Sequence, residues 1–321
     1  MILVCGGLAD SVTELVCARL VDCGYPYRLL DLGNYPAGFQ VKWHWQGSGP
    51  SGYIAGPDWK LDLDELSGVY IRYLGQEGRL PPPNIAPEAL PAIYSEYDTG
   101  LMVLLEDLPC TVVNRLGGGM SNNSKAYQAL LVRQSGLLIP PTLVTNDPQA
   151  AQSFYEEFHG EVIYKSLSGI RSIVRRLEPA QLERLSLLRN GPAQFQAFIP
   201  GENVRVHTVG DQWFATRVRS EAVDYRYARR EGRDVEMEPA IIPPAIAEAC
   251  LQLARQLDLL LAGIDLKETP DGDYYCFEVN PSPGFLYYEQ HTGQPISAAL
   301  ADLLHQGLNP QPTGERSMPM R

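Results

Sequence analysis

The chain has 321 residues, of which 45% are hydrophobic and 20% are charged, and its formal net charge is -12. This length fits two or three packed subdomains, and this composition excludes a disordered or fibrous chain. The negative charge argues against a nucleic-acid or membrane-surface role, because both of those partners are themselves negatively charged. Arg229, Arg230 and Arg233 alternate with acidic residues, which is typical of a solvated loop rather than a basic patch.

Cysteine usage and the N-terminus both indicate a reducing compartment. Six cysteines are scattered without a C-x-x-C pair, which predicts reduced, buried thiols at Cys5, Cys17, Cys23, Cys110, Cys250 and Cys276. The first residues lack the basic region and the cleavage site of a signal peptide. No apolar stretch reaches the length of about 20 residues that a membrane helix needs. We therefore expect a cytoplasmic protein.

The first 115 residues predict an α/β domain that opens with a β-α-β unit. Gly6-Gly7 follows the first expected strand, but the G-x-G-x-x-G spacing is absent, so a tight turn is favoured over a dinucleotide site. The expected strands are 2–5, 27–32, 66–72 and 111–114, with a hairpin over 41–45 and 52–55 and helices over 11–21 and 86–105.

A small α+β block is expected next. Ser124 as an N-cap predicts a helix that runs to Gln134 and carries Lys125 in its first turn. Asp147-Pro148 predicts a second helix start, and Gly160 its end. A hairpin that turns at Ser168-Gly169 follows. The expected strands are 142–145, 161–166, 173–177 and 193–199, and a short helix reaches residue 189.

The C-terminal part predicts a second α+β unit. Strands over 203–209 and 213–219 form a hairpin about Gly210-Asp211. The polar stretch 225–238 predicts a mobile loop, and an amphipathic helix is expected over 245–260. A last helix over 296–304 precedes a frayed tail.

The segment 263–280 predicts two strands joined by a Pro-Asp-Gly-Asp turn. Symmetric pairing about that turn gives three facing pairs: Thr269 with Tyr274, Lys267 with Cys276, and Asp265 with Glu278. Asn280 lies two residues beyond Glu278, so it shares the face of the two carboxylates.

Two directly facing carboxylates have Cβ atoms about 5 Å apart, which is destabilising unless a cation or a proton lies between them. A divalent metal explains the pair. Because oxygen ligands without His or Cys favour hard cations, we expect Mg²⁺ or Mn²⁺ to be held by Asp265, Glu278 and Asn280. The alternative is a solvated hairpin face on which Lys267 neutralises both acids.

Residues 278–284 read Glu-Val-Asn-Pro-Ser-Pro-Gly and resemble the E-x-N-x-S-P-G metal and substrate signature of ATP-grasp enzymes, especially RimK-type carboxylate–amine ligases. Gly263-Ile264-Asp265 is similar to the upstream metal aspartate of that superfamily. The resemblance runs from Asn114 to Leu304 and implies an ATP-grasp fold, α/β and α+β, behind an N-terminal Rossmann-like domain. It implies four parts: a pre-ATP-grasp domain over 1–115, a small subdomain over 116–200, a C-terminal subdomain over 201–308, and a flexible tail over 309–321.

The same resemblance implies an ATP site. Gln196-Ala197-Phe198-Ile199 is similar to the Q-E-Y-I hinge whose backbone reads the adenine edge, with Ala197 in place of the acid. Asn203-Val204-Arg205 resembles the D-I-R motif, which makes Arg205 a catalytic and phosphate-binding arginine. The remaining implied ATP contacts are Lys125, Lys165, Glu202 for the ribose, and the phosphate loop with Ser168 and Gly169.

The substrate site is implied by three residues. Asp224-Tyr225-Arg226 is similar to the D-F-R of the RimK group, which makes Arg226 a catalytic residue that holds the acceptor or acylphosphate, and Ser282 and Gly284 complete the set. His207 and His291 are general-base candidates by residue type only, because a lone His on a strand is more often structural.

The implied activity is an ATP-dependent, Mg²⁺-dependent ligation that forms ADP and phosphate. A carboxylate becomes an acylphosphate, which an amine or a hydroxyl then attacks. Segments such as Ile139-Pro140-Pro141-Thr142 also resemble microviridin-type graspetide ligases, so the substrate is a small molecule or a precursor peptide that is macrocyclised. Two further activities stay open, an ATP-grasp kinase and a non-catalytic nucleotide-binding module. The sequence leaves the oligomeric state open, including a homo-oligomer.

Overall fold

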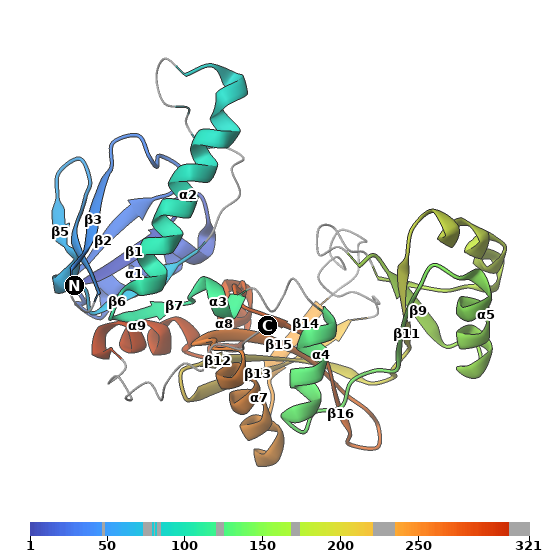
Figure 1. The fold of residues 1–321 in the computed structure, drawn as a ribbon. Helices are drawn as coiled ribbons and strands as arrows, with labels where there is room; N and C mark the ends of the chain where they lie inside the picture. Colours follow the sequence, from blue (N-terminus) through green and yellow to red (C-terminus); the bar gives the residue numbers. More distant parts are fainter. Residues whose placement is uncertain are drawn as a thin grey trace.

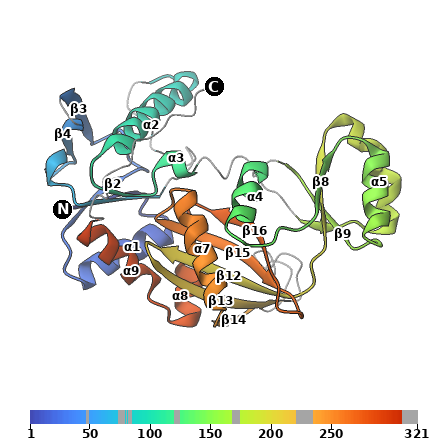
Figure 2. The same cartoon turned by 60° about the horizontal axis from the view of Figure 1, so that its bottom comes forward.

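The computed structural model describes residues 1–46, 49–72, 79, 81, 85–119, 125–167, 174–220 and 235–307. Within these ranges the strands form four sheets, three of which carry their own helices (Figure 1). Figure 2 shows the small sheet of residues 142–197 set apart from the rest of the chain and joined to it by extended segments.

The first sheet has the order β2-β1-β6-β7 and is parallel throughout. Along β1 the side chains alternate between two cores. Ile2 and Val4 pack with helices α1 and α9, whereas Leu3 and Cys5 pack with helix α2. The predicted β-α-β opening is confirmed. The elements are β1 (Ile2–Gly6), α1 (Ser11–Asp22), β2 (Tyr27–Asp31), β6 (Gly68–Ile71), α2 (Leu90–Asp107) and β7 (Thr111–Val113).

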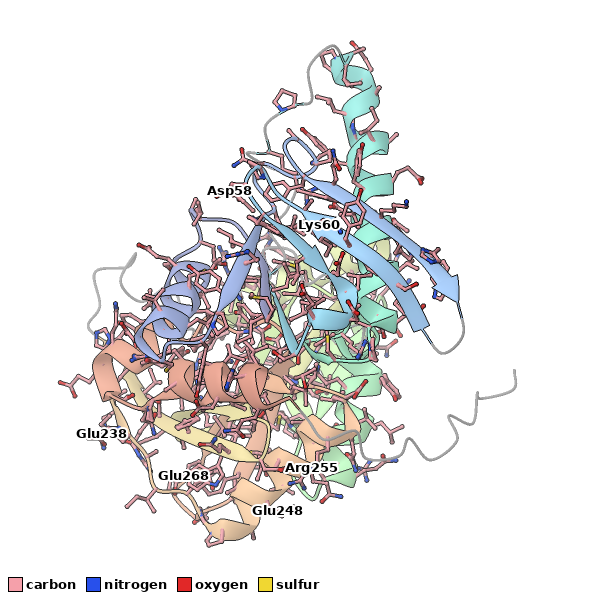
Figure 3. The ribbon with its side chains drawn as sticks, turned by 90° about the vertical axis from the view of Figure 1, so that its left-hand side faces the viewer. Asp58, Lys60, Glu238, Glu248, Arg255 and Glu268 are labelled. Atoms are coloured by element: carbon pink, nitrogen blue, oxygen red, sulfur yellow. The ribbon has the colours of Figure 1, made fainter. Side chains whose placement is uncertain are left out.

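A three-stranded antiparallel sheet lies beside α2. The predicted hairpin is present as β3 (Gln40–Gln46) and β4 (Gly49–Ala55), and β5 (Lys60–Asp62) adds a strand that was not predicted. Lys60 on this sheet forms an ion pair of 2.8 Å with Asp62, and Figure 3 shows its side chain on the outer surface. The apolar side chains of this three-stranded sheet pack instead in the core that it shares with α2.

The small sheet has the order β10-β9-β11-β8 and is antiparallel. Helix α5 begins as predicted, because the Asp147 side chain accepts a hydrogen bond from the backbone N–H of Gln149. The short helix that follows β10 is a 3₁₀ helix over Pro179–Asn190. The other elements are β8 (Thr142–Thr145), α5 (Pro148–Glu157), β9 (Val162–Lys165), β10 (Arg175–Arg176) and β11 (Ala193–Ala197).

The largest sheet has the order β14-β13-β12-β15-β16. Helices α4 and α7 cover one face with a core that includes Leu131 and Leu253, and helices α8 and α9 cover the other. The elements are α4 (Lys125–Gln134), β12 (Glu202–Val209), β13 (Gln212–Ser220), β14 (Val235–Pro239), α7 (Pro244–Gln256), β15 (Leu261–Glu268), β16 (Tyr274–Asn280), α8 (Leu286–Thr292) and α9 (Ile296–Gln306).

Three expectations were wrong. Residues 235–238 were predicted as loop, but β14 pairs with β13, because Val235 and Met237 alternate toward the core beneath α8. The helix expected to reach residue 260 ends at Gln256. Cys23 is exposed rather than buried, and Cys110 is half-buried, whereas the other four cysteines are buried; all six are free thiols.

The domain boundaries remain predictions. The boundary at residue 115 falls after β7 and the one at residue 200 falls after β11, so each lies between two sheets. Short helix α3 (Leu116–Gly119) and helix α8 were not predicted. Among the residues that the structure describes, no helix is long and apolar enough to cross a membrane.

Candidate active site

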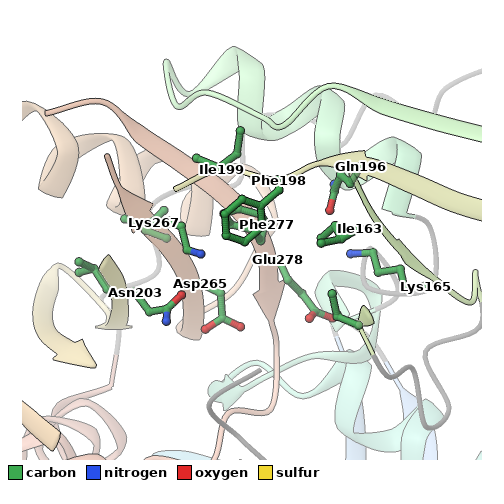
Figure 4. A pocket seen from close by; sticks show the side chains of 13 residues that line it. Ile163, Lys165, Gln196, Phe198, Ile199, Asn203, Asp265, Lys267, Phe277 and Glu278 are labelled. Atoms are coloured by element: carbon green, nitrogen blue, oxygen red, sulfur yellow. The ribbon is translucent and has the colours of Figure 1, made fainter. Parts of the chain in front are cut away.

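A cavity of about 120 Å³ lies where the small sheet faces the largest sheet (Figure 4). The small sheet contributes β9 and β11, and the largest sheet contributes β12, β15 and β16. A second cavity of about 560 Å³ adjoins it beneath α4 and shares Lys165, Gln196, Phe277 and Glu278. The first is lined by Ile163, Lys165, Val174, Gln196, Phe198, Ile199, Asn203, Val204, Asp265, Leu266, Lys267, Phe277 and Glu278.

The facing carboxylates predicted from the hairpin are present. Asp265 on β15 is the register partner of Glu278 on β16, and Figure 4 shows both side chains among those that line the cavity. The inner part of the predicted pairing was wrong, because Leu266 rather than Lys267 faces Cys276. A β-bulge on β16 absorbs the one-residue difference, and Asp265 and Glu278 meet because of it.

The oxygen atoms of this pair fit the predicted magnesium site. Asp265 and Glu278 supply carboxylates, and Asn280 supplies an amide whose Oδ1 accepts a hydrogen bond of 2.9 Å from the backbone N–H of Ser282. Within the described ranges no group of three or more His, Cys, Asp and Glu side chains could hold a metal ion. The predicted set holds only two such side chains, Asp265 and Glu278, besides the Asn280 amide, and its assignment to Mg²⁺ stays a prediction.

Arg205 reaches this pair from β12. Its Nη1 lies 2.7 Å from Asp265 Oδ1, and only 7% of the side chain is exposed. Gly263 makes the approach possible, since a Cβ there would lie 2.5 Å from Arg205 Cζ and 2.7 Å from Pro283 Cβ. In the Gly-Ile-Asp segment, Asp265 supplies the carboxylate, and Gly263, which has no Cβ, leaves room for the Arg205 guanidinium over β15.

His207 supports Arg205 from the same strand. Its ring is fully buried against Tyr288, and its Nε2 lies 3.4 Å from Arg205 Nε, which donates to it. Burial, together with the charge of Arg205, lowers the pKa of His207 well below its usual value. A neutral, buried ring that accepts from Arg205 fits a supporting role. His291 is exposed on α8, where its ring nitrogen contacts the Tyr287 carbonyl.

The hinge segment lines the cavity through Gln196, Phe198 and Ile199, whereas Ala197 is not among the lining residues. The backbone N–H groups of Ala197 and Phe198 donate to the carbonyls of Pro141 and Glu161, respectively, so these two N–H groups already have partners within the protein. Gln196 is 6% exposed, and its side-chain Nε2 donates to Thr142 Oγ1 at 3.0 Å. Its Oε1 has no hydrogen-bond partner among the described residues, and Figure 4 shows the amide end directed into the cavity.

The model of the RimK-like ATP-grasp domain matches residues 121–304, which is more than half of the chain. The chain belongs to the RimK-like ATP-grasp family. A probable alpha-L-glutamate ligase of Rhodopirellula baltica is 24% identical over 222 residues, which cover 66% of this chain and 54% of that protein. The chain thus matches about half the length of this relative.

Solved structures resemble this RimK-like ATP-grasp chain over nearly its whole length. The macrocyclase MdnC of Microcystis aeruginosa MRC, bound with precursor peptide MdnA, has a TM-score of 0.78 and 27% identity, covering 95% of this chain and 99% of that chain. The ATP-grasp ligase PsnB, complexed with minimal precursor, Mg and ADP, has a TM-score of 0.75 and 28% identity, covering 94% and 96%. The fold is the predicted ATP-grasp fold.

The other predicted contacts of this ATP-grasp site differ in where they lie. Lys165 lines both cavities at the end of β9. Glu202 is not among the lining residues; its carboxylate accepts hydrogen bonds from Arg217 and Arg219, which lower its pKa. Its ribose contact remains a prediction. Ser168, Gly169 and Arg226 fall outside the described residues, as does the side chain of Lys125 at the start of α4.

Lys267 and Gln128 also contribute to the site, and neither was predicted as a site residue. Lys267 lines the cavity two positions after Asp265 on β15, and strand alternation could have indicated it. Its ammonium lies 5.2 Å from the Phe198 ring, and burial, with the nearby Arg176, lowers its pKa. Arg205 forms an ion pair with Asp265, a role that the alternative interpretation gave to Lys267.

The second such residue, Gln128, had no local signal in the sequence. This buried side chain on α4 donates to the Val279 carbonyl and accepts from the Val279 N–H, both at 2.9 Å. The Gln128 amide therefore makes the two backbone hydrogen bonds that a neighbouring strand would make at the edge of β16, between Glu278 and Asn280. The backbone groups of Val279, between the predicted metal ligands Glu278 and Asn280, are thereby satisfied at the outer edge of β16.

Proposed function

We propose that this RimK-like ATP-grasp protein is an ATP-dependent ligase that joins a side-chain carboxylate to an amine or hydroxyl within a precursor peptide. The observation that carries the ligase assignment is the pair of facing carboxylates, Asp265 and Glu278, that lines the cavity between two sheets, with Arg205 Nη1 2.7 Å from Asp265 Oδ1. Support for a peptide substrate comes from the near full-length likeness, at 27% and 28% identity, to the MdnC macrocyclase bound with its precursor peptide and to PsnB complexed with its minimal precursor.

In this proposal ATP binds in the cavity with its base near the hinge. The buried Gln196 Oε1 supplies a hydrogen-bond acceptor that the rest of the described protein leaves open, and it suits the amino group of adenine. Its orientation is set by Thr142, whose hydroxyl donates to the Pro140 carbonyl at 2.8 Å and can therefore only accept from Gln196 Nε2. Lys165 lies further along β9, where it would neutralise phosphate charge.

Asp265, Glu278 and Asn280 would hold Mg²⁺ or Mn²⁺, which when bound neutralises phosphate charge and orients the phosphoryl group. Arg205 donates to the transferring phosphoryl group from a buried position, where its charge is weakly screened. The substrate carboxylate takes the γ-phosphoryl group and ADP leaves. The amine or hydroxyl then attacks the carbonyl carbon, loses its proton and expels phosphate. Arg226, Ser282 and Gly284 are proposed to hold the substrate.

The test is incubation of the purified chain with ATP, Mg²⁺ and candidate precursor peptides encoded near its gene, followed by mass spectrometry. A macrocycle has the mass of its precursor less one water for each bond formed, and ADP accumulates in proportion. Peptide that gains a phosphoryl group and yields no hydroxamate when hydroxylamine is added would instead indicate a kinase. ATP consumption that stays at background with every peptide and amino acid offered would indicate a nucleotide-binding module.

A further inference from the structure

The loop that follows the metal ligands is held by a residue of the N-terminal sheet. Arg72, directly after β6, donates from Nη1 to the Ser282 carbonyl at 2.8 Å, to Ser282 Oγ at 3.0 Å and to the Pro283 carbonyl at 3.2 Å. These residues are 210 positions apart in the sequence. No local pattern in either segment predicts the contact.

Arg72 is itself fixed on two sides. Its backbone N–H donates to the Cys5 carbonyl at 2.7 Å, and its Nε lies 3.3 Å from Asp10 Oδ2. Asp10 is the N-cap of α1 and also accepts from the backbone and hydroxyl of Thr13. The side chains of Arg72 and Asp10 are both 16% exposed, so the ion pair is shielded from most of the solvent.

The contacts of Arg72 determine how the loop presents its other face. In a trans peptide the C=O and N–H groups point in opposite directions, so a Pro283 carbonyl directed at Arg72 turns the Gly284 N–H away from it. A Cβ at Gly284 would meet no atom within 4 Å, so the space beside this residue is open. Asn280 fixes the other end of the loop through the Ser282 N–H.

We propose that Arg72 is a positioning residue that sets the 281–284 loop for substrate, so that the N-terminal sheet takes part in binding the peptide rather than only supporting the fold. The proposal rests on the proposed function, because it assigns the peptide to the open side of this loop. Arg72 acts through the backbone of Ser282 and Pro283. Asp10 holds the guanidinium in the orientation that this requires.

The chain offers a matched control in Arg19. This residue on α1 also joins the N-terminal sheet to the C-terminal helices, through Ser297 Oγ at 3.0 Å and Glu289 Oε1 at 3.3 Å. These two partners lie on α9 and α8, outside the 281–284 loop. If Arg72 were a structural link only, Arg72→Ala and Arg19→Ala would have similar consequences for every measured property.

The experiment compares Arg72→Ala, Arg72→Lys, Asp10→Asn and Arg19→Ala in steady-state ligation with the precursor peptide and ATP. We expect Arg72→Ala to raise the KM for peptide about tenfold, the effect of losing one charge-assisted hydrogen bond, with the KM for ATP unchanged. Lysine at position 72 should restore part of the loss. Asp10→Asn keeps a helix cap and should show a smaller change in the same direction. Arg19→Ala should leave both KM values unchanged.

A second measurement does not depend on turnover. Hydrogen–deuterium exchange of the full chain should speed up over residues 278–286 in Arg72→Ala and remain as in the parent chain in Arg19→Ala. Equal exchange in the two variants, or a parallel rise of both KM values in Arg72→Ala, would overturn the positioning role. A parent chain without ligation activity would refute the proposed function instead, while the exchange result would still decide whether Arg72 orders the loop.

Discussion

Gly263→Ala should separate catalysis from folding at this site. The new Cβ would lie 2.5 Å from Arg205 Cζ and 2.7 Å from Pro283 Cβ, and closer still to Arg205 Nη2. Ordinary contacts of a Cβ begin at 3.4 Å, whereas Arg205 Nη2 would lie at 2.0 Å, so the guanidinium must move. If Arg205 contacts the transferring phosphoryl group as proposed, a displacement of about 1 Å can lower kcat by about 100-fold. The backbone itself gains nothing disallowed, because Gly263 lies within regular strand β15.

The assay is steady-state ADP release with saturating ATP and peptide, combined with thermal unfolding of the same sample. Gly191→Ala is the control, since a Cβ there meets no atom within 4 Å and the φ of 174° is extended backbone. We expect Gly191→Ala to retain the parent kcat. A folded Gly263→Ala protein with the parent kcat would refute the inference that Arg205 must cross this strand in its present position.

Further substitutions test other parts of the site. Glu278→Gln should abolish Mg²⁺-dependent ADP formation while circular dichroism stays unchanged, and retained activity would remove Glu278 from the metal site. Arg226→Ala should weaken acceptor use more than ATP binding; equal losses of both would contradict its assigned role. Asn114→Ala should destabilise the fold by about 3 kcal/mol in urea unfolding, because its amide donates to the Leu261 and Pro281 carbonyls and accepts from the backbone N–H groups of residues 260 and 261. His207→Gln should flatten the acid side of the stability curve: with a folded pKa well below 6.5, the neutral ring stabilises the protein above that pH, and this contribution is lost as pH falls through and below 6.5. An unchanged slope between pH 7 and pH 5, within the range in which His titrates, would contradict that assignment.

The hairpin at 263–280 illustrates how far local reasoning extends. Turn chemistry and strand alternation predicted that Asp265 faces Glu278, and they do face each other. The pairs nearer the turn were off by one residue because of the β-bulge on β16. That bulge lies between two edge contacts, the backbone of Leu138 and the side chain of Gln128, which are supplied from distant parts of the chain. Tertiary partners of this kind leave no trace in the hairpin's own sequence.

The strand β14 illustrates the opposite case, in which a local signal was present. Val235-Glu236-Met237-Glu238 alternates apolar and acidic residues, as a half-buried edge strand does. Its charged neighbourhood favoured a loop in the prediction, but Met237 pairs with Val218 and packs against the core beneath α8. The contacts of Arg72 with the 281–284 loop and of Asn114 with Leu261 and Pro281 could not be predicted, since each spans more than 140 positions.

Gln128 has a mechanical consequence. Through this one amide, and through Leu131 and Val132 in the core shared with α7, helix α4 is fastened to the largest sheet. Lys165, in contrast, lies on β9 of the small sheet. If the small sheet moves on its extended connections, Lys165 moves with it, whereas α4, which begins at Lys125, stays with the largest sheet. A triphosphate that contacted Lys165 on β9 and the carboxylates on β15 and β16 at the same time would therefore hold the two sheets together.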